Sequence, residues 1–300
     1  MPARQMGVCI IDLDRIRATR GHGMDISHIK LLAFDMDGTA LDDMGHVTER
    51  TRLALQAVSD TGIMLVPATG RGFSRLREDT LGITDIDYAI SANGAILYDY
   101  AAGIERLRNL IPYAVAADLI DGLARRNTKI YLQLGDDTSS YFGNIYDFEL
   151  FARVEQGRVW RDNLEADLAG KIREMGCDVA KLGVVFLDWE TDIPKAMSFV
   201  AQSYPGLRSF RAERESIEIC KRDVSKGRAL QVLCEYLGIA SDEVCAVGDH
   251  GNDVSMIANV GLGVAMANGM DEVKAVARMV TDLPNGQEGF ADFLEKTFLR

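Results

Sequence analysis

The sequence contains few cysteines, and they are widely spaced. There are five in 300 residues, an odd number, and no two of them form a CxxC pair. A disulfide framework or a zinc site needs paired, closely spaced cysteines, so both are disfavoured. We expect reduced and mostly buried thiols.

Long apolar runs and an excess of basic residues are missing too. No apolar stretch approaches the roughly 18 residues that a membrane span needs, and the first 25 residues carry charges where a signal peptide would have its apolar centre. Lys and Arg number 33 against 45 Asp and Glu, which gives a net charge of −12. Binding to nucleic acid needs clustered basic side chains. We therefore expect a cytoplasmic protein that binds neither nucleic acid nor a membrane.

The chain begins with an alternation of short apolar runs and segments with helical spacing. Unbroken apolar runs at residues 31–34 and 63–66 predict buried strands, and residues 88–91 predict a third short strand. Residues 48–59 and a segment that starts at residue 73 lie between them and predict helices. Such alternation is typical of βαβ units and a parallel sheet.

This pattern is interrupted between residues 97 and 218 and then resumes. We expect an α/β fold in which a Rossmann-like parallel-sheet core, residues 28–96 and 219–300, carries an inserted α+β domain at residues 97–218. Residues 1–27 are expected to be an N-terminal extension.

The interrupting block mixes predicted strands and helices. A hairpin is expected at residues 95–107, strands at 129–134, 139–142, 179–187, 209–211 and 216–220, and helices at 113–126 and 192–203. Pro194 is expected in the first turn of the second helix, where its missing N–H is tolerated.

Polar residues occur at four points where predicted elements end or begin. They are Asp35, Asp37 and Thr39 after the first strand, Thr69 and Arg71 after the second, Lys226 at a helix start, and Asp249, Asn252 and Asp253 after a strand at 244–247. Ligands bind at the carboxyl ends of the strands in an open α/β sheet. We therefore expect these residues to meet in one crevice.

Acids gathered in one crevice suit particular chemistry. Carboxylates repel each other unless a cation lies beside them, and Mg²⁺ prefers oxygen ligands. A Lys and a Thr hydroxyl would add a positive charge and a donor, so the set predicts phosphoryl transfer. One carboxylate could attack phosphorus and form an aspartyl-phosphate. A second acid two residues on could protonate the leaving oxygen and then activate water.

Each of these residues has an ordinary explanation when taken alone. Two acids after a strand are common, Thr-Gly-Arg is a loop sequence, and a single Lys such as Lys226 is usually solvated. Their joint appearance at the ends of predicted elements is what indicates a site.

At these positions the sequence resembles the haloacid dehalogenase (HAD) superfamily. The four motifs that carry the resemblance are DMDGT at 35–39, Thr69 in ATGR, Lys226 in VSKG and GDHGND at 248–253. ISANGA at 90–95, the insertion after it and GVAMANG at 263–269 resemble the Cof-type branch, which carries a type IIB cap. The resemblance spans nearly everything from residue 29 onward. It implies a HAD-like core, an α+β cap and a magnesium-dependent phosphatase for sugar phosphates or similar phosphometabolites.

The resemblance also implies roles for single residues. Asp35 would be the nucleophile and Asp37 the general acid/base, an acid that the dehalogenase branch lacks. Mg²⁺ would be held by Asp35, the backbone carbonyl of Asp37 and Asp249, with Asp253 in support. The residues expected at the phosphate are Thr69, Gly70, Lys226 and Asn252. Candidates for substrate contacts at the crevice are Arg71, Asn93, Gly94 and His250, the last of which is otherwise an exposed loop residue. Asp136, Asp137, Tyr141, Asn144 and Tyr146 are candidates in the insertion, although ordinary turn and surface roles fit each of these five better.

Two other functions fit the same residues. A phosphomutase of the same fold would return the phosphoryl group to a sugar, and a non-catalytic protein would only bind a phosphometabolite. In each case the partner is a small-molecule phosphate ester, and the protein is expected to be a monomer or homodimer.

Overall fold

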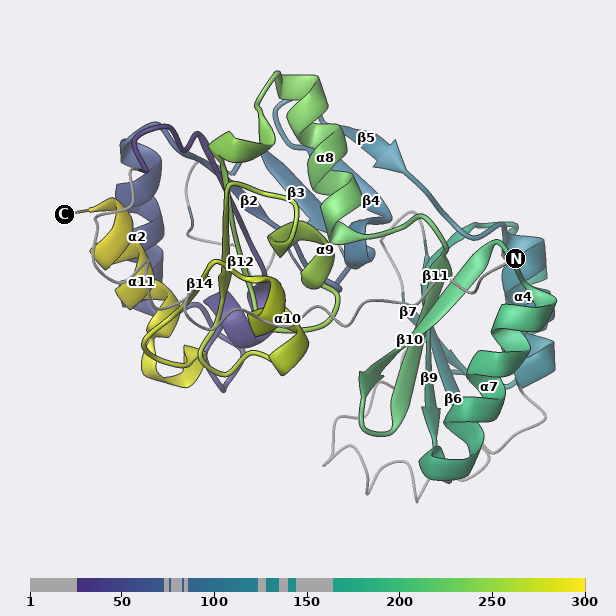
Figure 1. Ribbon diagram of the computed structural model, residues 1–300. Coiled ribbons are helices and arrows are strands. Elements are labelled where there is room, and N and C mark those ends of the chain that lie inside the picture. Colours follow the sequence, from purple (N-terminus) through teal and green to yellow (C-terminus); the bar gives the residue numbers. More distant parts are fainter. Residues whose placement is uncertain are drawn as a thin grey trace, which may run out of the picture.

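The structure, a computed structural model, describes residues 26–72, 76, 83, 86–123, 128–134, 140–143 and 164–299. It contains two bodies side by side (Figure 1). One is built on a parallel sheet, and the other on a largely antiparallel sheet that carries α4 (Tyr113–Leu123) and α7 (Trp189–Ser203).

The five strands of the first sheet are all parallel to their neighbours. Their order is β14 (Met279–Val280), β13 (Leu262–Ala265), β12 (Val244–Gly248), β1 (Leu31–Phe34) and β2 (Met64–Pro67). The chain adds β2 on one side of β1 and the later strands on the other. The strand order therefore reverses between β1 and β12, which is where open α/β sheets bind ligands. The predicted parallel-sheet core is confirmed.

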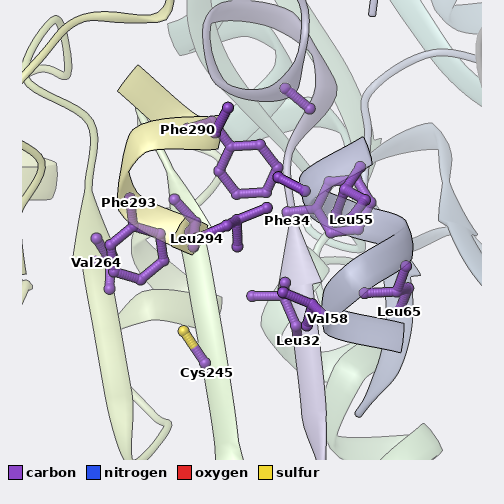
Figure 2. Packing of buried hydrophobic residues seen from close by; sticks show 14 of the residues in the cluster. Leu32, Phe34, Leu55, Val58, Leu65, Cys245, Val264, Phe290, Phe293 and Leu294 are labelled. Carbon is purple, nitrogen blue, oxygen red and sulfur yellow. The ribbon is translucent and has the colours of Figure 1, made fainter. Parts of the chain in front are cut away.

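Helices cover both faces of this sheet. One face packs against α2 (Glu49–Asp60) and α11 (Gly289–Phe298), and the other against α8 (Lys226–Leu237), α9 (Val254–Ile257) and α10 (Asp271–Val276). Figure 2 shows Phe34 of β1 beside Leu55 of α2 and Phe290 of α11. The two phenylalanine rings have centroids 5.4 Å apart.

The unbroken apolar run of β1 follows from this double cover. Successive strand side chains point to opposite faces, so Leu32 and Phe34 join the buried cluster under α2, and Leu31 and Ala33 join the one under α8. All four are fully buried. A charged side chain anywhere in this strand would lose its hydration without gaining a partner.

A second, smaller sheet continues from the first. It contains β3 (Tyr88–Ser91), β4 (Ile96–Asp99) and β5 (Ile104–Arg108), all antiparallel, and confirms the predicted hairpin. β3 pairs with Ala68, the residue after β2, through an isolated parallel bridge at Ile90. Leu97 of β4 belongs to the same buried cluster as Leu31. We therefore propose that the inserted domain begins after β5 and not at residue 97.

The inserted domain is an α+β unit. The strand order of its sheet is β10 (Leu207–Glu213), β11 (Ser216–Lys221), β9 (Val179–Phe186), β6 (Thr128–Leu134), β7 (Ser140–Gly143) and β8 (Leu164–Glu165). Helices α4, α6 (Leu168–Met175) and α7 pack on this sheet through a separate hydrophobic cluster. The chain thus leaves the parallel-sheet core and returns to it at α8, as predicted for a core with an inserted cap.

Two details of this domain differ from the prediction. Helix α7 begins at Trp189 and not at residue 192, so Pro194 lies beyond its first turn. The acidic residues Glu190 and Asp192 then lie in the first turn, where they interact favourably with the helix dipole. The sequence pattern also does not predict α6, an eight-residue helix between Asp167, which caps it, and Gly176 in the left-handed conformation.

The remaining short elements are single turns. They are η2 (Met36–Ala40), η3 (Ala92–Gly94), η4 (Ser241–Glu243) and η5 (Asn285–Gln287). In the described part of the chain, no helix combines the length and apolar character that crossing a membrane requires.

Candidate active site

The first acidic residue, Asp35, follows β1 at the point where the strand order reverses. Its N–H donates to the carbonyl of Val247 in β12 at 3.0 Å, and the N–H of Ala68 donates to the carbonyl of Phe34 at 2.8 Å. Hydrogen bonds from both neighbouring strands therefore hold the end of β1. The side chain of Asp35 is buried there.

The chain turns sharply after Asp35, and Gly38 makes this turn feasible. Its φ of +73° lies in the left-handed region, which strains residues with a Cβ. A Cβ on Gly38 would also collide with the carboxylate of Asp249. Two further contacts join the turn to its surroundings. Thr39 Oγ1 donates to Asp249 Oδ1 at 3.3 Å, and Asn268 Nδ2 donates to the carbonyl of Gly38 at 2.8 Å.

The loop after β12 holds the other acids. Asp253 is fully buried, and its Oδ2 accepts hydrogen bonds at 3.0 Å from the N–H groups of both Asp249 and His250. This side chain therefore organises the loop from within. Position 248 requires glycine, because a Cβ there would collide with the side chain of Asp253.

Lys226 joins the two acidic segments. Ser225 caps α8 by accepting a hydrogen bond from the N–H of Arg228, which puts Lys226 at the first helical position. Its Nζ donates to Asp35 Oδ1 and to Asp253 Oδ1, each at 2.6 Å, and both Lys226 and Asp253 are 0% exposed. The two carboxylates offset the free-energy cost of burying the charge of Lys226.

The cluster carries more negative than positive charge. Asp35, Asp249 and Asp253 each present an oxygen within 4.8 Å of the others, and Lys226 contacts two of them. Three negative charges against one positive charge leave a formal charge of −2. Burial, and then the charge of Asp253, raise the pKa of Asp35 well above its usual range and the pKa of Asp249 to about 6. Burial lowers the pKa of Lys226, but the charges of Asp253 and Asp35 outweigh it and raise the pKa overall.

Asp37 lies apart from this cluster. Its side chain is 57% exposed and forms a two-pronged ion pair with Arg71, whose Nε lies 2.7 Å from Asp37 Oδ2 and whose second nitrogen contacts Oδ1. Thr69, which is fully buried, accepts from the N–H of Arg71 at 3.1 Å through its hydroxyl. The loop after β2 is therefore tied to the loop after β1.

Among the predicted substrate and phosphate contacts, Asn93, Gly94 and Gly70 lie in closely packed surroundings. Asn93 is buried, and both ends of its amide have protein partners: Nδ2 donates to Glu218 Oε2 at 2.5 Å, and Oδ1 accepts from Asn252 Nδ2 at 3.0 Å. A Cβ on Gly94 would collide with the carbonyl of Ser225, and one on Gly70 would lie 2.8 Å from Asn93 Oδ1. Both glycines therefore serve close packing.

For the other substrate candidates the structure describes few side-chain contacts. His250 is half-buried, and its backbone N–H binds Asp253. Asp136, Asp137, Asn144 and Tyr146 lie outside the described residues, as does the side chain of Tyr141.

Sequence reasoning missed Lys181 of β9 and Glu218 of β11. Lys181 Nζ donates to Glu218 Oε1 at 2.5 Å, and both side chains are largely buried, with 10% and 12% exposed. A charged residue inside the apolar strand VAKLGVVF is the one sequence signal that could have found Lys181.

The comparison with protein families explains why these residues occur together. A family model for haloacid dehalogenase-like hydrolases matches residues 32–294. The chain belongs to this family. It is therefore a HAD-like hydrolase, and the predicted family resemblance is confirmed.

Several known proteins are similar over nearly the whole chain. The Bacillus subtilis protein YxeH is 31% identical over 277 residues, which cover 90% of this chain and 98% of YxeH. The 5-amino-6-(5-phospho-D-ribitylamino)uracil phosphatase YitU of the same organism is 28% identical over 279 residues, 89% of this chain and 97% of YitU. The solved structure of BT1666 from Bacteroides thetaiotaomicron, a phosphatase of the HAD superfamily, matches with a TM-score of 0.76 at 27% identity. It covers 93% of this chain and 98% of BT1666.

Proposed function

We propose that this HAD-like hydrolase is a magnesium-dependent phosphatase that hydrolyses a small phosphate ester through an aspartyl-phosphate on Asp35. The observation that carries the proposal is the cluster of the buried Asp35 and Asp253 with the half-buried Asp249, in which Lys226 binds the first two. Similarity to the phosphatases YitU and BT1666 supports it.

The acidic cluster fits a divalent cation. Its donors are all oxygens, as Mg²⁺ prefers, and the formal charge of −2 is the charge that such an ion would balance. Asp35, Asp249 and the backbone carbonyl of Asp37 would hold the ion, with Asp253 in support through its bonds to the loop. When bound, Mg²⁺ would offset the repulsion between the carboxylates and an anionic phosphate.

The residues of this chain divide the reaction into two displacements. In the first, a carboxylate oxygen of Asp35 attacks phosphorus, the ester P–O bond breaks, and Asp37 gives its proton to the leaving oxygen. In the second, Asp37 takes a proton from water, the water oxygen attacks phosphorus, and the bond to Asp35 breaks. Lys226 and Thr69 would hold the phosphoryl oxygens, with the amide of Gly70 beside them and Asn252 ordering the loop.

The ion pair with Arg71 bears on the role of Asp37. The fork holds Asp37 at Arg71, and repulsion by the other carboxylates favours the same position. A phosphate that enters beside Arg71 would compete for the same guanidinium. We propose that this competition frees Asp37 to take up a proton from solvent and to reach the leaving group.

The same comparisons support a proposal for the substrate class. YitU is named for a substrate whose phosphate sits on a ribityl chain. We propose a sugar phosphate or a similar phosphometabolite as the substrate of this chain. The partner is then a small molecule.

Phosphate release from a panel of small phosphate esters tests the proposal. We expect turnover with Mg²⁺ and loss of it when EDTA removes the metal, because the uncompensated carboxylates would repel the substrate. NMR of one sugar phosphate should show free phosphate and the free sugar. An isomerised sugar phosphate without free phosphate would indicate the mutase, and binding without any turnover would indicate the non-catalytic protein.

The stabilisation by Mg²⁺ should depend on pH. The pKa values of Asp35 and Asp249 are raised, and that of Asp249 reaches about 6. A raised carboxyl pKa stabilises the metal-free fold at low pH, and this contribution is lost as the pH rises through the folded-state pKa. Metal binding needs the ionised carboxylates. The rise in melting temperature with Mg²⁺ should therefore be larger at about pH 7.5 than at about pH 5.

Differential scanning fluorimetry at the two pH values measures this effect. Sodium chloride at matched ionic strength is the control, because it screens charges without binding the site. An equal rise at both values would mean that the ion binds elsewhere.

A further inference from the structure

Four polar side chains, two buried and two partly buried, connect the inserted domain to the loop that holds Asp249 and Asp253. The connection runs from Lys181 to Glu218, then to Asn93 and to Asn252, with hydrogen bonds of 2.5, 2.5 and 3.0 Å. We propose that these four residues form a relay, the cap relay, which makes the geometry of the metal-binding loop depend on the docked position of the cap. The proposal rests on the proposed function, because that function makes the loop metal-binding.

The cap end of the relay is a buried ion pair. Glu218 lies opposite Gly183 in the pairing of β11 with β9, so Lys181 is its diagonal neighbour, two residues along. Removing either partner would leave the other charge buried and unpaired. Both oxygens of Glu218 are used, one by Lys181 and the other by Asn93 across the domain boundary. The cap therefore presents a rigid, charged acceptor to the core.

Asn93 is the centre of the relay. Its φ of +58° is unusual for a residue with a side chain, and Asn and Asp tolerate it better than most others. Its Oδ1 also faces Gly70, where a Cβ would lie 2.8 Å away, and that hypothetical Cβ would lie 3.5 Å from Lys181 Nζ. Asn93 thus contacts the cap, the loop after β2 and the loop after β12 at once.

The core end of the relay lies in the acidic loop. Asn252 immediately precedes Asp253, whose carboxylate binds Lys226 and the N–H groups of Asp249 and His250. The remaining amide oxygen, Oδ1 of Asn252, is buried without a hydrogen-bond partner. The bond to Asn93 is therefore what orients this amide. A shift of the cap would therefore move the side chain of Asn252, the residue immediately before Asp253.

Reversing one hydrogen bond and then restoring it tests the relay. N93D keeps the size of the side chain and tolerates the backbone conformation, but it places a carboxylate against Glu218. Adding E218Q supplies an amide N–H to Asp at position 93, while the Gln oxygen can still accept from Lys181 and the Asp oxygen from Asn252. All three hydrogen bonds can then form again. The control is E174Q, which alters an exposed ion pair with Lys171 on α6 of the same domain.

The readouts are the Mg²⁺ concentration for half-maximal hydrolysis of p-nitrophenyl phosphate, and the Mg²⁺-induced rise in melting temperature. N93D should raise that concentration by about tenfold or more, the double variant should return it to within about threefold of wild type, and E174Q should leave it unchanged. A purely structural role would lower the metal-free melting temperature without moving the Mg²⁺ requirement.

The two proposals fail in different ways. Wild-type turnover with an unchanged Mg²⁺ requirement in N93D would overturn the relay alone, and so would a double variant no better than N93D. Absence of wild-type turnover would overturn the proposed function. In that case the melting temperatures would still decide on the relay, since loss of the Mg²⁺ shift in N93D and its return in the double variant would support it. A wild type that shows no turnover and that Mg²⁺ does not stabilise would overturn both.

Discussion

Replacing Asp35 by Asn should reduce phosphate-ester turnover by on the order of 10⁴-fold or more, with the fold intact. An amide cannot attack phosphorus to form the acyl phosphate, so the first displacement is lost and substrate binding alone remains. Asp37, Thr69 and Lys226 stay in place, but no residue among the described ones could substitute for Asp35 at the end of β1. Phosphate release at saturating Mg²⁺ measures the loss.

The fold should survive because Asp35 adds to a surplus of charge. The cluster has a formal charge of −2, and Asn at position 35 would reduce it while its amide oxygen could still accept from Lys226. Urea unfolding of the metal-free variant should therefore show stability equal to or above that of wild type. Asp60→Asn, at the exposed end of α2, is the matched control and should change neither quantity. Turnover within about tenfold of wild type would exclude Asp35 as the nucleophile.

The position of Asp35 could be predicted because local signals and topology agree. The apolar run of β1 identifies a strand that is buried on both faces, and its end lies where the strand order of the sheet reverses. Lys226 is similar, since Ser225 before it and Gly238 at the other end identify the helix that begins with it. The family motifs then group residues that lie far apart in the sequence.

The contacts that could not be predicted depend on register and on the docking of the two domains. Lys181 and Glu218 meet because β11 pairs with β9 in one register, and a shift by one residue would turn Glu218 to the other face. The amide of Asn93 meets Glu218 only because the cap lies on the core at that point. Likewise, both Asp37 and Arg71 are candidates from sequence, but no pattern indicates that they form an ion pair.

Replacing Lys226 by Met should destabilise the metal-free protein by about 3–5 kcal/mol, the usual cost of breaking a buried ion pair by removing one partner. Met has a similar length and no charge, so the loss would come from the charge and its hydrogen bonds. Asp35 and Asp253 would lose their bonds to Nζ, and these two buried carboxylates would lie beside the half-buried Asp249 without a cation. Turnover should fall as well, since the phosphoryl group loses a positive contact.

Magnesium should recover part of that stability, and this recovery distinguishes an electrostatic loss from a packing defect. An ion at Asp35 and Asp249 would supply the positive charge that Lys226 provides, so the difference in unfolding free energy between wild type and K226M should shrink as Mg²⁺ is added. Lys195→Met on α7 removes an exposed lysine paired with Asp192 and should cost about 0–1 kcal/mol, independently of Mg²⁺. Urea unfolding with and without Mg²⁺ measures both variants. A K226M loss that Mg²⁺ leaves unchanged would mean that Lys226 and the metal do not act on the same carboxylates.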